Sequence, residues 1–157
     1  MKVFCHPEVI DRLLKGERCN PVYIRIKPTN RCNHNCNYCH YRHSYLDLDE
    51  YNPNDEIPRE KMLEIVRDMK EHGVKAVTFS GGGEPLLYPH IEETMQAVLD
   101  AGIDLSIITN GSLLKEKKAE ILAKASGCAF PSSRSMMKNT AASAGSSPAL
   151  SMRCAKI

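Results

Sequence analysis

Three cysteines stand close enough together in the sequence to bind one metal centre. They are Cys32, Cys36 and Cys39, in the spacing C-x3-C-x2-C. Thiolates are soft ligands, and thiolates this close in a loop can converge on one iron–sulfur cluster without long-range folding. Because a 4Fe–4S cube has four irons, three cysteines would leave one iron open to a cofactor or substrate. The alternative is a zinc site that takes His34, His40 or His43 as its fourth ligand.

Two further motifs could contribute to a binding site. The run Ser80-Gly81-Gly82-Gly83-Glu84-Pro85 contains three glycines, which let a backbone approach a ligand closely, and a carboxylate that could accept from an ammonium group. The other motif is Thr109-Asn110-Gly111. Each of them alone is also typical of an ordinary tight turn.

The apolar pattern around these motifs predicts alternating strands and helices. The predicted strands are residues 22–27, 75–79 and 103–108. The predicted helices begin at Pro58, at Ile91 and at the capping residue Ser112, and the first two end at Gly73 and Gly102. The third helix is expected to carry Leu113, Leu114, Ile121 and Leu122. This alternation predicts an α/β fold with a parallel sheet and right-handed crossovers.

Each of the three motifs directly follows a predicted strand. The cysteine loop comes after the first strand, the glycine run after the second and Thr109-Asn110-Gly111 after the third. The carboxyl ends of parallel strands share one edge of the sheet, and α/β folds bind their ligands at that edge. The sequence therefore predicts that the three motifs meet at one site.

At these residues the chain resembles the radical S-adenosylmethionine (radical SAM) enzyme superfamily. The hallmark of that family, C-x3-C-x-aromatic-C, is matched by Cys32, Cys36, Tyr38 and Cys39. Its G-G-E-P motif at the second strand is matched by Gly82, Gly83, Glu84 and Pro85. The segments 28–31 and 108–111 also look like family sequence, so the resemblance covers about residues 20–126.

The resemblance implies a 4Fe–4S cluster and S-adenosylmethionine as cofactors, and it favours iron–sulfur over zinc. Cys32, Cys36 and Cys39 would ligate three irons, and the methionine part of the cofactor would chelate the fourth. The groups expected to receive its amino group are the carbonyls of Ser80, Gly81, Gly82 and Gly83 and the Glu84 carboxylate. Tyr38 would pack near the adenine, unless it is merely a core aromatic, and Asn110 would contact the ribose.

The resemblance also implies the reaction and the fold. The reduced cluster would cleave the cofactor to methionine and a 5′-deoxyadenosyl radical, which abstracts hydrogen from a substrate that the sequence does not identify. A reductant such as flavodoxin or ferredoxin would supply the electron. The expected fold is the N-terminal half of a partial (β/α) TIM-like barrel with about three β/α units. The alternatives are an inactive fragment of such an enzyme or a small zinc-binding α/β module.

The organisation of the chain changes near residue 126. We expect an N-terminal extension over residues 1–20, an incomplete radical SAM core over 21–126 and a Ser/Ala-rich, disordered tail over 127–157. All nineteen acidic residues precede the tail, which carries four basic residues. The tail is also what a shifted reading frame would give, because Met136-Met137-Lys138 reads as Asp-Glu in the shifted frame. The chain would then be a truncated enzyme.

Composition and charge set the remaining expectations. A net charge of +2 over 157 residues is too small to indicate nucleic-acid binding. Neither a signal peptide nor a stretch of membrane-spanning length is recognisable. Seven cysteines in such a sequence indicate metal binding in a reducing compartment, so we expect a cytoplasmic protein that does not associate with membranes.

Overall fold

The computed structural model describes residues 6–39, 41, 51–125 and 127–129. Its centre is a four-stranded parallel sheet in the order β1-β2-β3-β4. The strands are β1 (Tyr23–Ile26), β2 (Ala76–Phe79), β3 (Asp104–Ile108) and β4 (Gly127–Ala129). The helices are α1 (Pro7–Leu14), α3 (Arg59–Glu71), α4 (Ile91–Asp100), α5 (Glu116–Ala123) and the short 3-10 helix η2 (Pro85–Leu87). Consecutive strands are neighbours and are joined through helices, which confirms the expected α/β fold.

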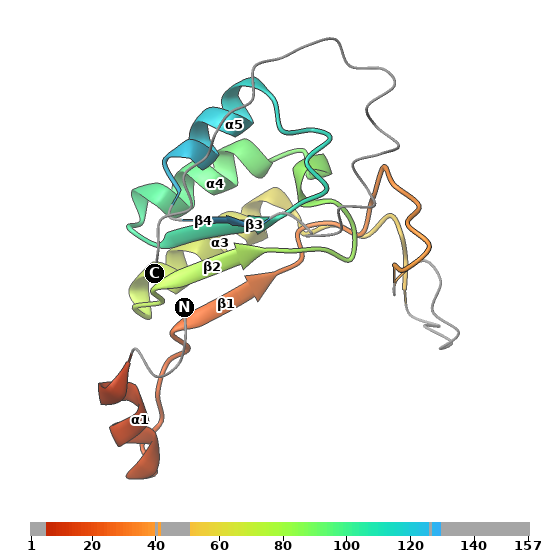
Figure 1. Ribbon diagram of the computed structural model, residues 1–157. Coiled ribbons are helices and arrows are strands. Elements are labelled where there is room, and N and C mark those ends of the chain that lie inside the picture. Colours follow the sequence, from red (N-terminus) through yellow and green to blue (C-terminus); the bar gives the residue numbers. More distant parts are fainter. Residues whose placement is uncertain (1–5, 40, 42–50, 126, 130–157) are drawn as a thin grey trace.

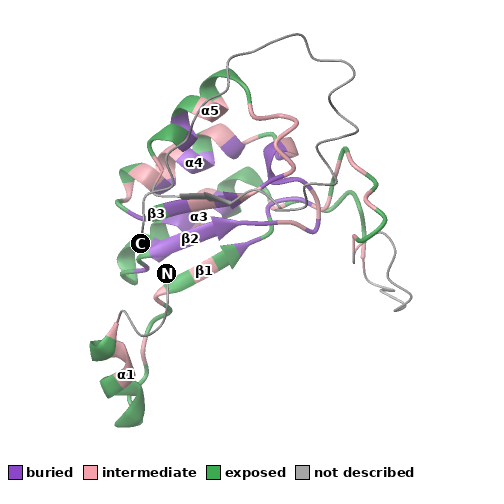
Figure 2. Cartoon of the chain, in the orientation of Figure 1, coloured by how far each residue is buried: buried purple, intermediate pink, exposed green. Residues whose placement is uncertain are grey.

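The three long connecting helices cover one face of the sheet (Figure 1). Their buried apolar residues follow helical spacing, as with Met62, Val66 and Met69 of α3. Strand residues that point to the same side are buried against them, among them Ile26, Val77, Phe79, Leu105 and Ile107. The core therefore lies between the sheet and this helical layer, where buried residues concentrate in Figure 2.

The opposite face of the sheet carries polar residues at matching positions. Successive residues of a strand point to opposite sides, so Arg25 points away from the side of Ile24 and Ile26. Arg25 pairs in register with Thr78, which pairs with Ser106. We call this line of three residues the polar row. In doubly wound sheets a second set of helices covers this face, and the strand residues beneath them are apolar. The polar row is not typical of a face covered in that way.

The third connecting helix begins later than the sequence predicted. Ser112 was expected to cap it, but α5 starts at Glu116, with Lys115 at the capping position. The Ser112 hydroxyl instead donates to the Asn110 side-chain oxygen at 2.7 Å. Leu113 and Leu114 precede the helix and still pack against the core.

Both ends of the described chain add elements to the expected three β/α units. β4 pairs with β3 in parallel, beginning at Ser106 with Gly127, so the sheet continues past the expected boundary at residue 126. The expectations for residues 130–157 fall outside the described residues. Near the N-terminus, α1 projects away from the sheet (Figure 1) and has no buried residue. In the described residues, no helix has the length and apolar character to cross a membrane.

Candidate active site

The three sequence motifs meet at the carboxyl ends of the strands. The backbone N–H of Gly83 donates to the Thr29 carbonyl at 3.0 Å, and that of Glu84 donates to the Arg31 carbonyl at 2.8 Å. These bonds join the glycine run after β2 to the segment that leads into the cysteine loop. Glu84 in turn binds the turn after β3, so three segments far apart in the sequence form one connected site.

The glycines let these segments approach each other closely. A Cβ atom on Gly82 would lie 2.1 Å from the Asn30 side-chain oxygen, and one on Gly83 would lie 2.0 Å from the Arg31 carbonyl oxygen. A Cβ on Gly81 would lie 1.7 Å from the carbonyl oxygen of Gly83. Since real atoms do not approach this closely, Gly81 and Gly83 are required by backbone contacts within the protein, and at Gly82 the Asn30 side chain would have to move.

Glu84 is buried, with 3% of its surface exposed, and its carboxylate accepts three hydrogen bonds. One oxygen accepts from the Leu86 backbone N–H at 3.0 Å and from the Thr109 hydroxyl at 2.5 Å. The other accepts from the Asn110 backbone N–H at 2.8 Å. The side chain thus ties the exit of β2 to the exit of β3, a contact that neither motif indicates by itself.

Asn110 uses its side chain to contact the cysteine loop. Its amide nitrogen donates to the Asn33 side-chain oxygen at 3.0 Å, and its oxygen accepts from the backbone N–H and hydroxyl of Ser112. The Asn33 amide donates to the Ser112 hydroxyl at 2.8 Å. Sequence reasoning did not identify Asn33 or Ser112 as site residues, although Asn33 directly follows Cys32.

Tyr51 is a second residue that sequence reasoning missed. Its hydroxyl lies 3.1 Å from the carbonyl oxygen of Asn30 and 3.2 Å from that of Gly82, so its single proton is shared between these two acceptors. Its ring stacks on Tyr41, with 5.7 Å between the ring centroids. The Gly82 carbonyl is one of those expected to receive the cofactor's amino group, so Tyr51 orients an expected ligand-binding group.

The three cysteines of the motif lie in one partly exposed loop. Cys32, Cys36 and Cys39 are each of intermediate exposure, and none forms a disulfide. The backbone N–H of Cys39 donates to the Cys36 carbonyl at 2.9 Å, which makes a turn between them. No three His, Cys, Asp or Glu side chains converge on a common point in the described part of the chain. The donor set nevertheless fits an iron–sulfur cluster, since it offers three accessible soft ligands.

The structure describes Tyr38 and one of the three histidines that were candidates for a zinc ligand. Tyr38 is 64% exposed, so the alternative that it is a core aromatic is wrong. His34 has intermediate exposure and its backbone N–H lies 3.5 Å from the Cys32 sulfur. The other two candidates for a zinc ligand, His40 and His43, fall outside the described residues.

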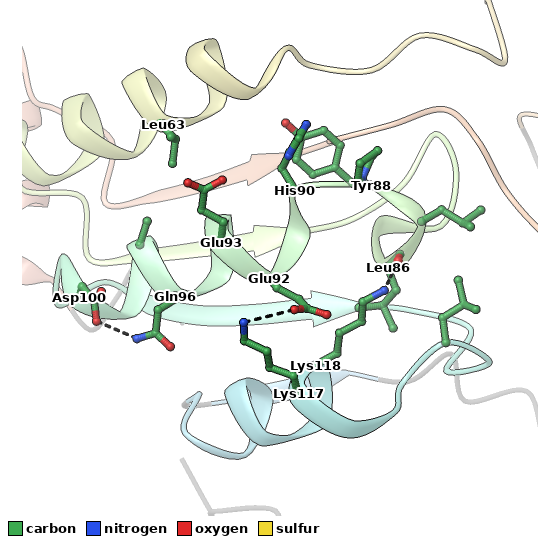
Figure 3. A pocket seen from close by; sticks show the side chains of 14 residues that line it. Leu63, Leu86, Tyr88, His90, Glu92, Glu93, Gln96, Asp100, Lys117 and Lys118 are labelled. Atoms are coloured by element: carbon green, nitrogen blue, oxygen red, sulfur yellow. Dashed lines mark hydrogen bonds and ion pairs between the residues drawn. The ribbon is translucent and has the colours of Figure 1, made fainter.

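A separate pocket of about 900 Å³ lies on the helical side, over α4 (Figure 3). None of the residues expected at the cofactor site lines it. Both of its lysines have partners: Lys117 pairs with Glu92 at 3.6 Å, and Lys118 donates to the Leu86 carbonyl at 2.9 Å. It is therefore a surface groove distinct from the three-loop site.

Comparison with known proteins decides the family. Residues 26–132 match the model of the Radical SAM superfamily. The chain belongs to this superfamily. The resemblance seen in the cysteine and G-G-E-P motifs is thereby confirmed, and enzymes of this superfamily use a 4Fe–4S cluster and S-adenosylmethionine.

Similar proteins include several nucleotide-modifying enzymes. A probable GTP 3′,8-cyclase of Methanothermobacter marburgensis is 41% identical over 96 residues, which are 60% of this chain and 29% of that protein. An S-adenosylmethionine-dependent nucleotide dehydratase of Lacinutrix mariniflava is 36% identical over 123 residues, 71% of this chain and 25% of that protein. The chain thus spans less than a third of the length of these relatives.

A solved structure with bound S-adenosylmethionine shares the fold. The crystal structure of Streptococcus suis SuiB bound to S-adenosylmethionine superposes with a TM-score of 0.60 at 26% sequence identity. The match covers 80% of this chain and 28% of SuiB. The parallel α/β arrangement described above is therefore shared with part of a protein that binds S-adenosylmethionine.

Proposed function

We propose that this chain holds a 4Fe–4S cluster on Cys32, Cys36 and Cys39 and binds S-adenosylmethionine beside it, as part of a radical SAM enzyme. The observation that carries the proposal is the joining of the cysteine loop, the glycine run and the turn after β3 by hydrogen bonds at one end of the sheet. Membership of the superfamily supports it. The chemistry available when both groups are bound is reductive cleavage of S-adenosylmethionine to methionine and a 5′-deoxyadenosyl radical, which abstracts hydrogen from the substrate.

The residues of the site would divide this work among them. The three thiolates would bind iron, and the segment from Ser80 to Gly83 would offer carbonyl oxygens to the amino group of methionine. Tyr51 supports this role because its hydroxyl holds the Gly82 carbonyl in place. The exposed Tyr38 ring is available to pack against the adenine, and Asn110 is proposed to contact the ribose.

Anaerobic reconstitution with iron and sulfide tests the proposal. We expect a brown protein with four irons per chain that, with dithionite and S-adenosylmethionine, produces methionine and 5′-deoxyadenosine detectable by mass spectrometry. The electron donor in the cell is proposed to be a flavodoxin or ferredoxin in the cytoplasm, where thiols stay reduced. A colourless chain that takes up zinc instead, and does not cleave the cofactor, would support the zinc-module alternative.

We further propose that the substrate carries a negatively charged group, such as the phosphates of a nucleotide, bound at the polar row. Arg25 on β1 points to the face opposite the helices, and Lys27 follows two residues later, just beyond the end of the strand. Lys27 donates to the Tyr41 hydroxyl at 2.5 Å, and Arg25 makes no ion pair with the described residues. Two neighbouring cations repel each other, and a bound anion offsets that repulsion. The nucleotide enzymes among the relatives support this class of substrate.

Replacing Arg25 by glutamine is expected to weaken binding of GTP to the reconstituted chain about tenfold, because a charge-assisted hydrogen bond is lost. Arg67, an exposed arginine of α3 on the helical side, provides the matched control. Isothermal titration with GTP should give nearly the same dissociation constant for Arg67→Gln as for the unchanged chain. Equal weakening by the two substitutions would show only a general effect of net charge and would refute a site at the polar row.

A further inference from the structure

We propose that Asn33 is a positioning residue that sets the place of the cysteine loop relative to the cofactor-binding loops, through Asn110 and Ser112. This inference rests on the proposed function, since it concerns how the two expected cofactors are held side by side. The residues involved come from the exits of β1 and β3, and Glu84 anchors them at the exit of β2.

The anchor is the buried carboxylate of Glu84. Its hydrogen bonds fix the Thr109 hydroxyl and the Asn110 backbone N–H, so the start of the turn after β3 has one position relative to the glycine run. A buried carboxylate with several donors holds its neighbours firmly, because releasing any donor leaves a polar group without a partner away from water. The backbone from which the Asn110 side chain extends is therefore itself held in place.

From this anchored turn, three side chains form a closed ring of hydrogen bonds. Asn110 donates to Asn33 at 3.0 Å, Asn33 donates to Ser112 at 2.8 Å, and Ser112 donates to Asn110 at 2.7 Å. The Ser112 backbone N–H adds a fourth bond to Asn110 at 3.0 Å. Each side chain both donates and accepts. Rotating the side-chain amide of Asn33 or Asn110 by 180° would therefore bring two donors or two acceptors together. The ring consequently fixes one orientation of Asn33.

The ring contacts the cysteine loop through the Asn33 side chain. Asn33 is joined directly to Cys32, the first expected iron ligand, whereas Asn35 and Asn37 of the same loop make no hydrogen bond with the described residues. Asn33 is also exposed, so its side chain contributes little to the core. Its hydrogen bonds are therefore suited to orient the loop, and losing them should disturb cofactor geometry more than folding.

The test compares Asn33→Ala with Asn35→Ala, a matched change two residues away. In the reconstituted chain we expect Asn33→Ala to keep four irons and its melting temperature but to weaken S-adenosylmethionine binding about tenfold, with altered g-values in the cofactor-bound electron paramagnetic resonance spectrum. Ser112→Ala should have the same effect, and the double variant should be no worse than either single one, because both break one ring. Asn35→Ala should change affinity less than twofold.

The proposal is overturned if Asn33→Ala and Asn35→Ala bind the cofactor equally well, or if the Asn33 and Ser112 effects simply add. A measurement on the chain without iron separates this outcome from failure of the proposed function. There, Ser112→Ala should shift the side-chain amide resonances of Asn33 in the ¹⁵N–¹H NMR spectrum and leave those of Asn35 in place. If the Asn33 resonances do not move, the ring does not exist in solution and the proposal is wrong, whether or not a cluster assembles.

Discussion

Replacing any one of Cys32, Cys36 and Cys39 by alanine is expected to abolish assembly of the iron–sulfur cluster. Each thiolate is proposed to bind a different iron, and two thiolates alone would not hold the cube in the protein. The iron and acid-labile sulfide contents after anaerobic reconstitution should fall from four of each per chain to nearly zero. The absorbance near 400 nm, which gives the cluster its brown colour, should disappear with them.

Cys19 offers the matched control for these variants. It is also a free thiol of intermediate exposure, but it precedes β1 and lies outside the cysteine motif. Cys19→Ala should therefore retain the full iron content. A complete iron complement in any one of the three motif variants would be strong evidence against the assigned ligands, as would loss of iron in Cys19→Ala with retention in the others.

Replacing Glu84 by alanine is expected to destabilise the fold and to weaken cofactor binding while the cysteine loop still takes up iron. The substitution leaves the Leu86 and Asn110 backbone N–H groups and the Thr109 hydroxyl without their acceptor. Loss of a buried partner costs about 1–3 kcal/mol per unsatisfied group, although the three losses need not add. We expect the free energy of unfolding in urea to fall by about 3 kcal/mol.

Glu84→Gln is the conservative comparison, because its amide oxygen can still accept from the Leu86 N–H. It should lose less stability than Glu84→Ala, while its amide group no longer offers a second acceptor to the Asn110 N–H. If Glu84→Ala unfolds at the same urea concentration as the unchanged chain, the carboxylate does not anchor the turn. Equal affinity for S-adenosylmethionine in the variant would remove Glu84 from the cofactor site.

Much of the fold could be predicted because it depends on local patterns. Helix α3 forms as expected from the apolar period of Met62, Val66 and Met69 and from Gly73, which follows its end. Both signals are local, because each depends only on residues that are close together in the sequence. Ser112 misled the prediction because a serine before a helix is also a residue that binds neighbouring side chains. The Ser112 hydroxyl donates to Asn110 and accepts from Asn33, which is 79 residues away in the sequence.

The candidate site was predictable only in part, for the same reason. The cysteine motif, the glycine run and the turn after β3 are recognisable because each is contiguous, and strand order places them together. The contacts between them are not contiguous: Glu84 reaches Thr109 and Asn110, and Tyr51 reaches Gly82. Neither a glutamate nor a tyrosine carries a local signal for a partner 25 or 31 residues away. The sequence also suggested that the glycines serve a ligand, whereas backbone contacts with Gly83 and Arg31 already require Gly81 and Gly83.

Electron–nuclear double resonance can detect whether S-adenosylmethionine binds at an iron left open by Cys32, Cys36 and Cys39, as we propose. The reconstituted chain is reduced with dithionite, frozen with S-adenosylmethionine labelled with ¹⁵N at the methionine amino group, and compared with a sample that contains unlabelled cofactor. We predict a ¹⁵N hyperfine coupling to the reduced cluster that replaces the ¹⁴N signal of the unlabelled sample. If the reduced 4Fe–4S spectrum is the same with and without the cofactor and shows no nitrogen coupling, S-adenosylmethionine does not bind at the cluster.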